Sequence, residues 1–165
     1  MMDKIFWLIL LTFVPTLELR WSIPIGLFKG VLQIPLFGEW VGFALPIEIV
    51  FPVVIISNIF LGVLIYFLLD KFVHLLIKIK RIEKVYNYFV IRTQKNSKKL
   101  IEKYGVLGIA LFIAIPLPGS GSYTGALAAY LLGIGYKKFF IANMIGVIIA
   151  GIIVSIVSLG LFSLF

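Results

Sequence analysis

Two long apolar segments limit what this chain can fold into. Residues 41–69 contain one formal charge, Glu48, and residues 139–165 contain none. Each segment exceeds the roughly 20 residues that a helix needs to cross the hydrocarbon core of a bilayer. The chain is 62% hydrophobic and only 13% charged, which is outside the range of soluble domains. We therefore predict a multi-pass integral protein of the cell membrane.

Basic residues are concentrated in one segment, residues 71–103. Ten of the fifteen Lys and Arg residues lie there, together with only two acidic residues, Glu83 and Glu102. By the positive-inside rule this segment is predicted to be a cytoplasmic linker, and its apolar and basic residues at helical spacing favour amphipathic helices on anionic lipid. Because topology alone requires these charges, no nucleic acid is expected as a partner.

The chain looks duplicated around two polar segments that each begin with proline. Alignment of Pro15 with Pro116 sets "FVPTLELRWSIPIGLF" against "AIPLPGSGSYTGALAA", and a long apolar segment follows each at nearly the same distance. We call residues 15–22 the first turn and residues 116–122 the second turn. Internal repeats of this kind are common among transporters. The predicted regions are a first repeat (1–70), the basic linker (71–103) and a second repeat (104–165).

The apolar segments beside the turns contain only ten to twelve residues, so none of them can cross a membrane alone. Two foldings remain open: each turn is the tip of a re-entrant helical hairpin, or it is the break inside one discontinuous spanning helix. Re-entry leaves one true crossing in each repeat and places Lys137 and Lys138 on the cytoplasmic side with the linker, as the positive-inside rule favours. We predict an all-α membrane protein of two inverted repeats, each a re-entrant hairpin followed by a transmembrane helix.

The second turn has the composition of an anion-binding site. Non-helical backbone at membrane depth is tolerated only where protein buries it or where it lines a wet cavity, so we expect the two turns to meet. Prolines end the incoming helix, glycines allow close approach of the backbone, and a serine is expected to cap the outgoing helix, whose N-terminus attracts anions. A plain hairpin turn is the alternative. The predicted substrate-binding residues here are Pro118, Gly119, Ser120, Gly121 and Ser122.

Charged residues in the first turn point to a functional role, because ionisable side chains at membrane depth are costly unless they are paired or hydrated. Arg20 suits a phosphate group through its planar fork, and Ser22 begins a helix beside it. Glu18 is predicted to carry a coupling proton. The alternative is an internal Glu18–Arg20 ion pair that braces the hairpin. Glu48 either assists proton coupling or reaches the outer surface.

These motifs resemble the small multidrug export protein family, itself similar to the DedA/VTT superfamily. The resemblance rests on "ELRWSIPIG", "SNIFLGV" and "EKYGVLGIALFIAIPLPGSGSYTGALAAYLLG". It implies re-entrant helices packed against transmembrane helices and transport linked to protons or sodium, with relatives that move polyprenyl-phosphate or phospholipid head groups. Glu18 and Arg20 carry over from the first motif, and residues 118–121 from the second. DedA proteins usually have further arginine where this chain has "SGSYT".

We predict a membrane transporter or flippase, ion-coupled, that moves an amphipathic anion such as a polyprenyl or phospholipid phosphate. An exporter of hydrophobic cations is one alternative, and a noncatalytic scaffold or scramblase is another. With no cysteine and one histidine, neither a metal site nor a cofactor is expected, and no catalytic constellation suggests an enzyme. The expected partners are membrane lipids, the substrate and a coupling proton or sodium ion, and a homo-oligomer is left open.

Overall fold

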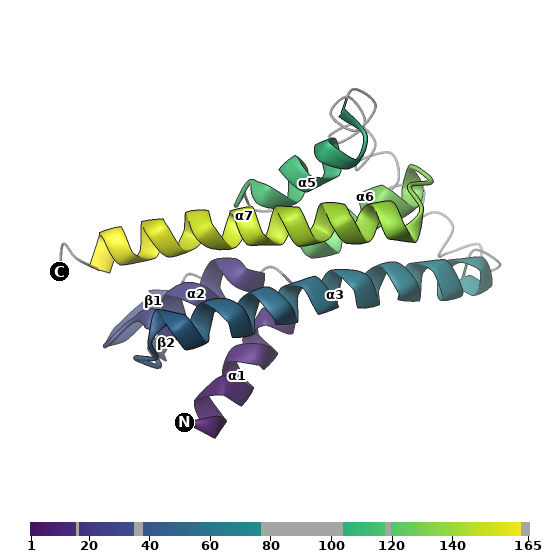
Figure 1. Ribbon diagram of the computed structural model, residues 1–165. Coiled ribbons are helices and arrows are strands. Elements are labelled where there is room, and N and C mark those ends of the chain that lie inside the picture. The colour runs from purple at the N-terminus through teal and green to yellow at the C-terminus, as the bar shows by residue number, and fades with distance from the viewer. Residues whose placement is uncertain (16, 35–37, 77–103, 118–119, 163–165) are drawn as a thin grey trace. The chain divides into compact units, whose positions relative to one another are not determined.

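A computed structural model describes residues 1–15, 17–34, 38–76, 104–117 and 120–162 (Figure 1). Most of the basic linker therefore lies outside the described residues. In chain order the elements are α1 (Met2–Phe13), α2 (Glu18–Leu27), β1 (Val31–Ile34), β2 (Gly38–Val41), α3 (Ile47–Leu76), α5 (Val106–Ala114), α6 (Ser122–Leu131) and α7 (Tyr136–Phe162).

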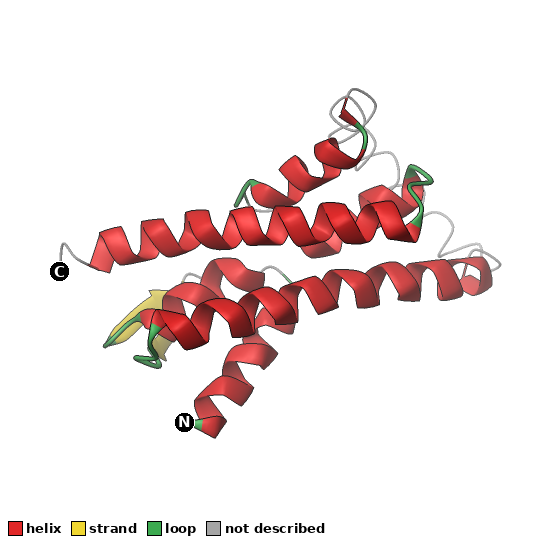
Figure 2. Cartoon of the chain, in the orientation of Figure 1, coloured by secondary structure: helices red, strands yellow, loops and turns green. Residues whose placement is uncertain are grey.

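The described residues are mostly helical, with one short β-hairpin between α2 and α3 (Figure 2). Its strands are antiparallel, with Val31 opposite Val41 and Ile34 opposite Gly38. The all-α prediction missed this hairpin. A Cβ atom at Gly42 would overlap the Phe28 carbonyl oxygen, so only glycine lets the chain return this closely to the end of α2. Each strand has only four residues, so its β-branched side chains were not recognised as a strand beside the long apolar segments.

Helices α3 and α7 confirm the expectation of two helices long and apolar enough to cross a membrane. The apolar parts are Ile47–Lys71 and Tyr136–Leu161, with 25 and 26 residues. Pro46 precedes α3, and the helix continues through Pro52, which lies one turn into it. By contrast, α1, α2, α5 and α6 have between nine and twelve residues each, which is about half of a crossing.

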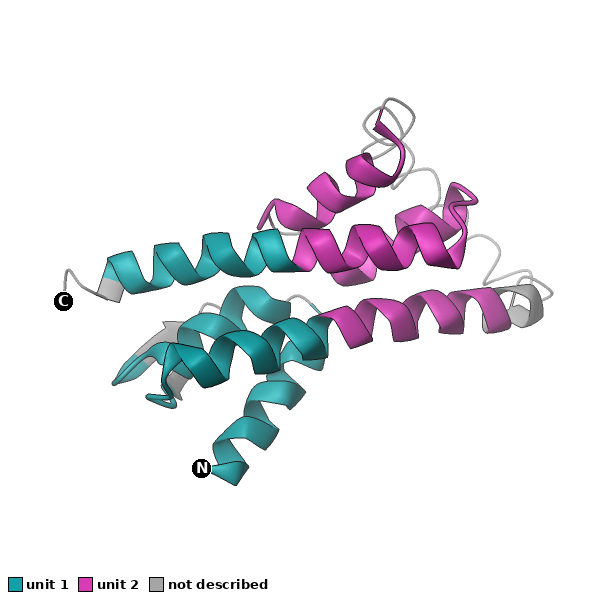
Figure 3. Cartoon of the chain, in the orientation of Figure 1, with its two compact units in different colours: residues 1–58, 148–165 teal, residues 59–147 magenta. Residues whose placement is uncertain are grey.

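The chain divides into two compact units (Figure 3). Unit 1 contains residues Met1–Asn58 and Ile148–Phe165, and unit 2 contains residues Ile59–Val147. Each unit therefore has one pair of short helices and a part of both long helices. The inverted relation of the two repeats and the division of the chain into three regions stay predictions.

In unit 1, α1 and α2 fold back on one another through a glycine contact. A Cβ atom at Gly26 would lie 3.2 Å from Leu8 Cδ1 on α1 and 2.8 Å from Val50 Cγ1 on α3. At the turn between α1 and α2, a buried apolar cluster forms around Leu11, Leu17 and Ile25. The absence of a side chain at Gly26 thus lets three helices pack closely and fixes the position of the first turn.

In unit 2, α5 and α6 form a second helical hairpin, in which a Cβ atom at Gly125 would lie 2.5 Å from Ile113. The parts of α3 and α7 in this unit run antiparallel. The Asn143 side-chain amide donates to the Ile59 carbonyl oxygen at 3.1 Å, and the Tyr66 hydroxyl donates to the Ile134 carbonyl oxygen at 2.9 Å. Interhelical polar contacts of this kind hold membrane helices together where the hydrophobic effect does not.

Candidate functional site

The first turn holds a buried carboxylate in an unfavourable backbone conformation. Helix α1 ends at Phe13, Val14 is extended, and α2 begins at Glu18. Glu18 has a φ of 42° and its residue is only 3% exposed. A non-glycine residue in the left-handed region costs free energy, and such residues are concentrated at functional sites. The turn therefore keeps an ionisable side chain inside the protein at a conformational cost.

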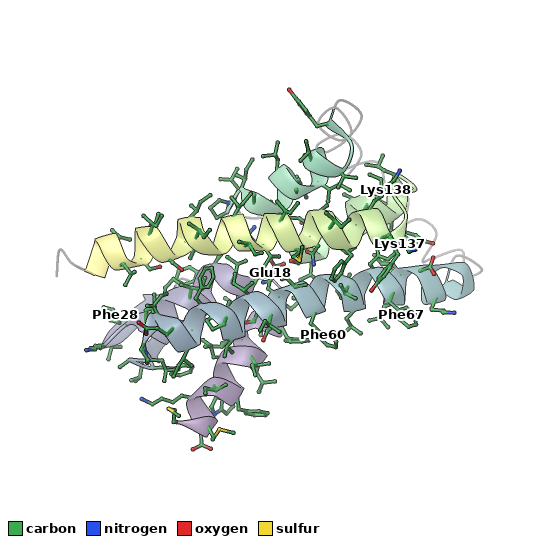
Figure 4. The ribbon with its side chains drawn as sticks, in the orientation of Figure 1. Glu18, Phe28, Phe60, Phe67, Lys137 and Lys138 are labelled. Atoms are coloured by element: carbon green, nitrogen blue, oxygen red, sulfur yellow. The ribbon has the colours of Figure 1, made fainter. Side chains whose placement is uncertain are left out.

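Arg20 lies next to Glu18, as the sequence predicted. The Glu18 carboxylate (Figure 4) acts electrostatically on the Arg20 guanidinium. Arg20 is partly buried and lies in the same helical turn of α2 as Glu18. Ser22 is fully buried, and its hydroxyl donates to the Glu18 carbonyl oxygen at 2.7 Å. The prediction that Ser22 begins a helix was wrong, because α2 already begins at Glu18 and the Ser22 proton is engaged within the helix. The roles of Arg20 and Ser22 in substrate binding stay predictions.

Glu48 differs from Glu18 in its surroundings. It is exposed and lies one residue after the start of α3. A carboxylate at this position interacts favourably with the partial positive charge of the helix N-terminus, and this interaction alone can account for an acidic residue here. Both alternatives for Glu48, assistance in proton coupling and a place at the outer surface, stay predictions.

The second turn differs from the expected capping arrangement. Pro118 and Gly119 lie outside the described residues. Helix α6 begins at Ser122, and its N-cap is Gly121, with a φ of 119° and no side-chain capping bond. The Ser120 hydroxyl points back instead, toward the carbonyl oxygens of Ile115 at 2.5 Å and Leu117 at 2.8 Å. The capping prediction for Ser120 and Ser122 was wrong, because the carbonyls freed at the end of α5 attract the Ser120 hydroxyl and Ser122 already lies in the helix.

The first turn belongs to unit 1 and the second turn to unit 2. Within each unit the structure places the predicted residues close to one another in space, as their short spacing requires. The predicted meeting of the two turns stays a prediction.

Sequence reasoning missed a third feature, a cavity of about 460 Å³ in unit 2. Its polar lining residue is Asp70, and its aromatic lining residues are Phe60, Tyr66, Phe67 and Tyr136. We call this cavity the aromatic pocket. Val63 and Leu64 complete it. Phe60 and Phe67 lie seven residues apart on one side of α3 (Figure 4), and this spacing was the sequence signal that could have indicated the pocket. Tyr136 belongs to α7, which is far from α3 in the sequence.

The wall of the aromatic pocket is held in place by ring packing. Tyr66 stacks on Phe139 with ring centroids 5.0 Å apart. It makes a T-shaped contact with Tyr130, with centroids 6.2 Å apart, and a tilted contact with Tyr136, with centroids 5.9 Å apart. The hydrogen bond from the Tyr66 hydroxyl to the Ile134 carbonyl oxygen further restricts rotation of the Tyr66 side chain. Asp70 acts electrostatically on the Tyr66 and Tyr130 hydroxyls, which places the carboxylate beside this aromatic group.

Comparison with known proteins gives one family. A family model described as "Putative small multi-drug export protein" matches residues 18–153, which is more than half of the chain. Neither curated proteins nor solved structures give a match. The similarity to the DedA/VTT superfamily is outside this finding and stays a prediction. Together with the two long apolar helices, the match indicates a membrane protein.

Proposed function

Because the chain belongs to the small multi-drug export protein family, we propose that it is an ion-coupled, multi-pass transporter of the cell membrane that exports small amphipathic compounds. In this proposal Glu18 carries the coupling proton and Arg20 is its electrostatic partner. Transport requires no covalent chemistry, no cofactor and no metal from the chain.

The observation that carries the proposal is the buried, left-handed Glu18 beside Arg20. With Glu18 ionised, the two side chains have no net charge. Protonation of Glu18 would give the turn a net charge of +1 and remove the attraction that holds Arg20 in place. A proton therefore changes both the charge and the contacts of the first turn, which is what coupling to a gradient requires.

The charges at the helix ends support an orientation in the membrane. In unit 2, the bond from Tyr66 to Ile134 brings the start of α7 beside the C-terminal part of α3. Lys137 and Lys138 at the start of α7 (Figure 4) therefore lie at the same end of these helices as Lys71, which ends the α3 span. The positive-inside rule makes this end cytoplasmic. The start of α3 and the end of α7 are then outside.

Cysteine labelling tests this orientation, because the chain has no native cysteine. A cysteine at Lys138 should be labelled by a membrane-impermeant maleimide only after the cells are opened. Cysteines at Met1 and Val41 should be labelled in intact cells, since we place α1 and the β-hairpin on the outer side. Labelling of position 138 in intact cells would contradict the orientation. A cysteine-free chain is the control for background labelling.

Reconstitution into proteoliposomes tests the function. We expect the wild-type protein to move a fluorescent hydrophobic cation such as ethidium, and the rate to rise when a pH gradient is imposed. The same vesicles with a sodium gradient at constant pH show which ion is coupled. Movement that no ion gradient changes would remove the coupling role of Glu18, and failure to move any amphipathic probe would overturn the proposed function.

A second candidate is a flippase for a lipid phosphate, and one observation favours it. Helix α6 begins at Ser122 after the N-cap Gly121, which has a positive φ, and the helix has no acidic residue in its N-terminal turn, so its N-terminal amides suit an anion. The Ser120 hydroxyl, however, is engaged with the carbonyls of the hairpin. In the same vesicles this candidate predicts movement of a fluorescent phospholipid phosphate that is lost in Gly121→Val, while ethidium is not moved.

A further inference from the structure

We propose that the aromatic pocket of unit 2 binds lipophilic cations, such as arylphosphonium and arylammonium ions, with Asp70 as their counter-charge. The inference rests on the proposed export function and names the class of compound that is exported.

The size and lining suit a drug-sized aromatic ligand. Small-molecule sites have volumes of about 300–1,000 Å³ and are mostly apolar, with a few polar groups that orient the ligand. The aromatic pocket, at about 460 Å³, has one carboxylate among aromatic and aliphatic side chains. Rings of a ligand would lie against Phe60 and Phe67, which are both more than half exposed and therefore accessible.

The charge distribution favours a cation. The face of an aromatic ring attracts cations within about 6 Å of its centroid, and a carboxylate adds a full negative charge. Such an interaction is already present in the chain, because Lys71 Nζ lies 5.8 Å from the centroid of the Phe67 ring. The Phe67 ring thus accepts an ammonium group at the edge of the pocket. A ligand cation would compete with the Lys71 ammonium for the face of the Phe67 ring.

The pocket is pre-organised. Tyr66 is only 8% exposed and is held by three rings and by its hydroxyl bond to Ile134. A wall that is already ordered loses little conformational entropy when a ligand binds. Tyr66 therefore offers part of a rigid surface, and a bound ligand would displace the exposed Lys71 side chain from the Phe67 ring.

The location agrees with uptake from the cytoplasmic side. Asp70 lies next to the last residue of the α3 span, and Phe60 lies ten residues before it, about 15 Å along the helix. A cation with an aromatic body would leave its charge near the interface and place its rings at the depth of the acyl chains. Lys137 and Lys138 are exposed at this end, where water and salt screen their repulsion.

Binding of tetraphenylphosphonium to the purified full-length protein in lipid nanodiscs tests the inference, with calorimetry as the readout and no ion gradient. Asp70→Asn keeps the shape and removes the charge, and we expect it to weaken binding about tenfold. Asp3→Asn, which changes another exposed carboxylate, at the start of α1, should bind as the wild type does. The anion tetraphenylborate, of the same shape, should bind at least tenfold more weakly than the cation.

Lys71→Gln provides a second measurement that loss of folding cannot imitate, because binding should become about threefold tighter once the competing ammonium is removed. Lys29→Gln, an exposed lysine of unit 1, is the matched control and should change nothing. Equal affinity of wild type and Asp70→Asn, or equal affinity for tetraphenylborate, would overturn the pocket assignment.

The two proposals fail separately. If the cation binds in a way that depends on Asp70 but is not transported, the pocket assignment stands and the export function is wrong. If the cation is transported and Asp70→Asn binds it as the wild type does, the export function stands and the pocket assignment is wrong.

Discussion

Glu18→Gln and Arg20→Met are each expected to abolish transport, and the double variant that combines them is expected to be equally inactive while recovering the stability of the wild type. Loss of one partner from a buried ion pair costs about 3–5 kcal/mol, whereas removal of both is often nearly neutral. Arg20 is only partly buried, so we place the cost of each single variant at about 3 kcal/mol. Thermal unfolding in detergent and proteoliposome transport measure the two effects on the same preparations.

Stability and transport of the double variant together distinguish a coupling role of the Glu18–Arg20 pair from a bracing role. If the pair only braces the hairpin, the double variant will transport as well as it folds. Arg20→Lys keeps the charge but not the planar fork, and we expect it to fold normally and to transport at a reduced rate. Lys29→Met, an exposed cation beyond the end of α2, is the matched control and should change neither measurement. An active double variant would make the first turn a structural device.

Gly62→Ala is expected to lower the free energy of unfolding by about 2–4 kcal/mol, although alanine favours helices more than glycine does. The new Cβ atom would lie 2.5 Å from Asn143 Nδ2 and 2.7 Å from Asn143 Oδ1. Asn143 is completely buried, so its amide has little room to move without losing the 3.1 Å bond to the Ile59 carbonyl. Displacement of this amide leaves a buried polar group poorly satisfied, which adds to the cost of overpacking.

Gly160→Ala is the matched control, since nothing lies within 4 Å of a Cβ atom at that position of α7. There the same substitution should leave the midpoint of thermal unfolding unchanged or raise it slightly. Adding Asn143→Ala to Gly62→Ala should recover part of the lost stability, because the colliding amide is gone. A Gly62→Ala protein as stable as Gly160→Ala would show that α3 and α7 do not pack at this contact.

The sequence by itself determined the properties that depend on composition and on neighbouring residues. Two long apolar segments became helices of membrane length, because a helix satisfies the backbone hydrogen bonds of a segment within that segment. Proline and glycine interrupted the chain at both turns, and the short spacing of Glu18 and Arg20 was enough to bring the pair together. The export family was likewise visible in local motifs.

Only the tertiary structure decided which partners the polar groups chose. The Ser120 hydroxyl could cap α6 or turn back to α5, and the positions of the Ile115 and Leu117 carbonyls settled this. The hydroxyl of Ser22 likewise turned inward, to the carbonyl of Glu18. Such choices depend on distances of a few tenths of an ångström, which residue spacing along the chain does not contain.

The aromatic pocket shows the same limit at longer range. Asp70 reads as an ordinary charge at the end of an apolar segment, and Tyr136 as an interfacial aromatic residue 66 positions away. They line one cavity because Tyr66 binds the Ile134 carbonyl and brings the start of α7 against α3. Membrane length is a property of each segment alone, whereas a cavity exists only where two segments pack imperfectly, so its residues had to be found in three dimensions.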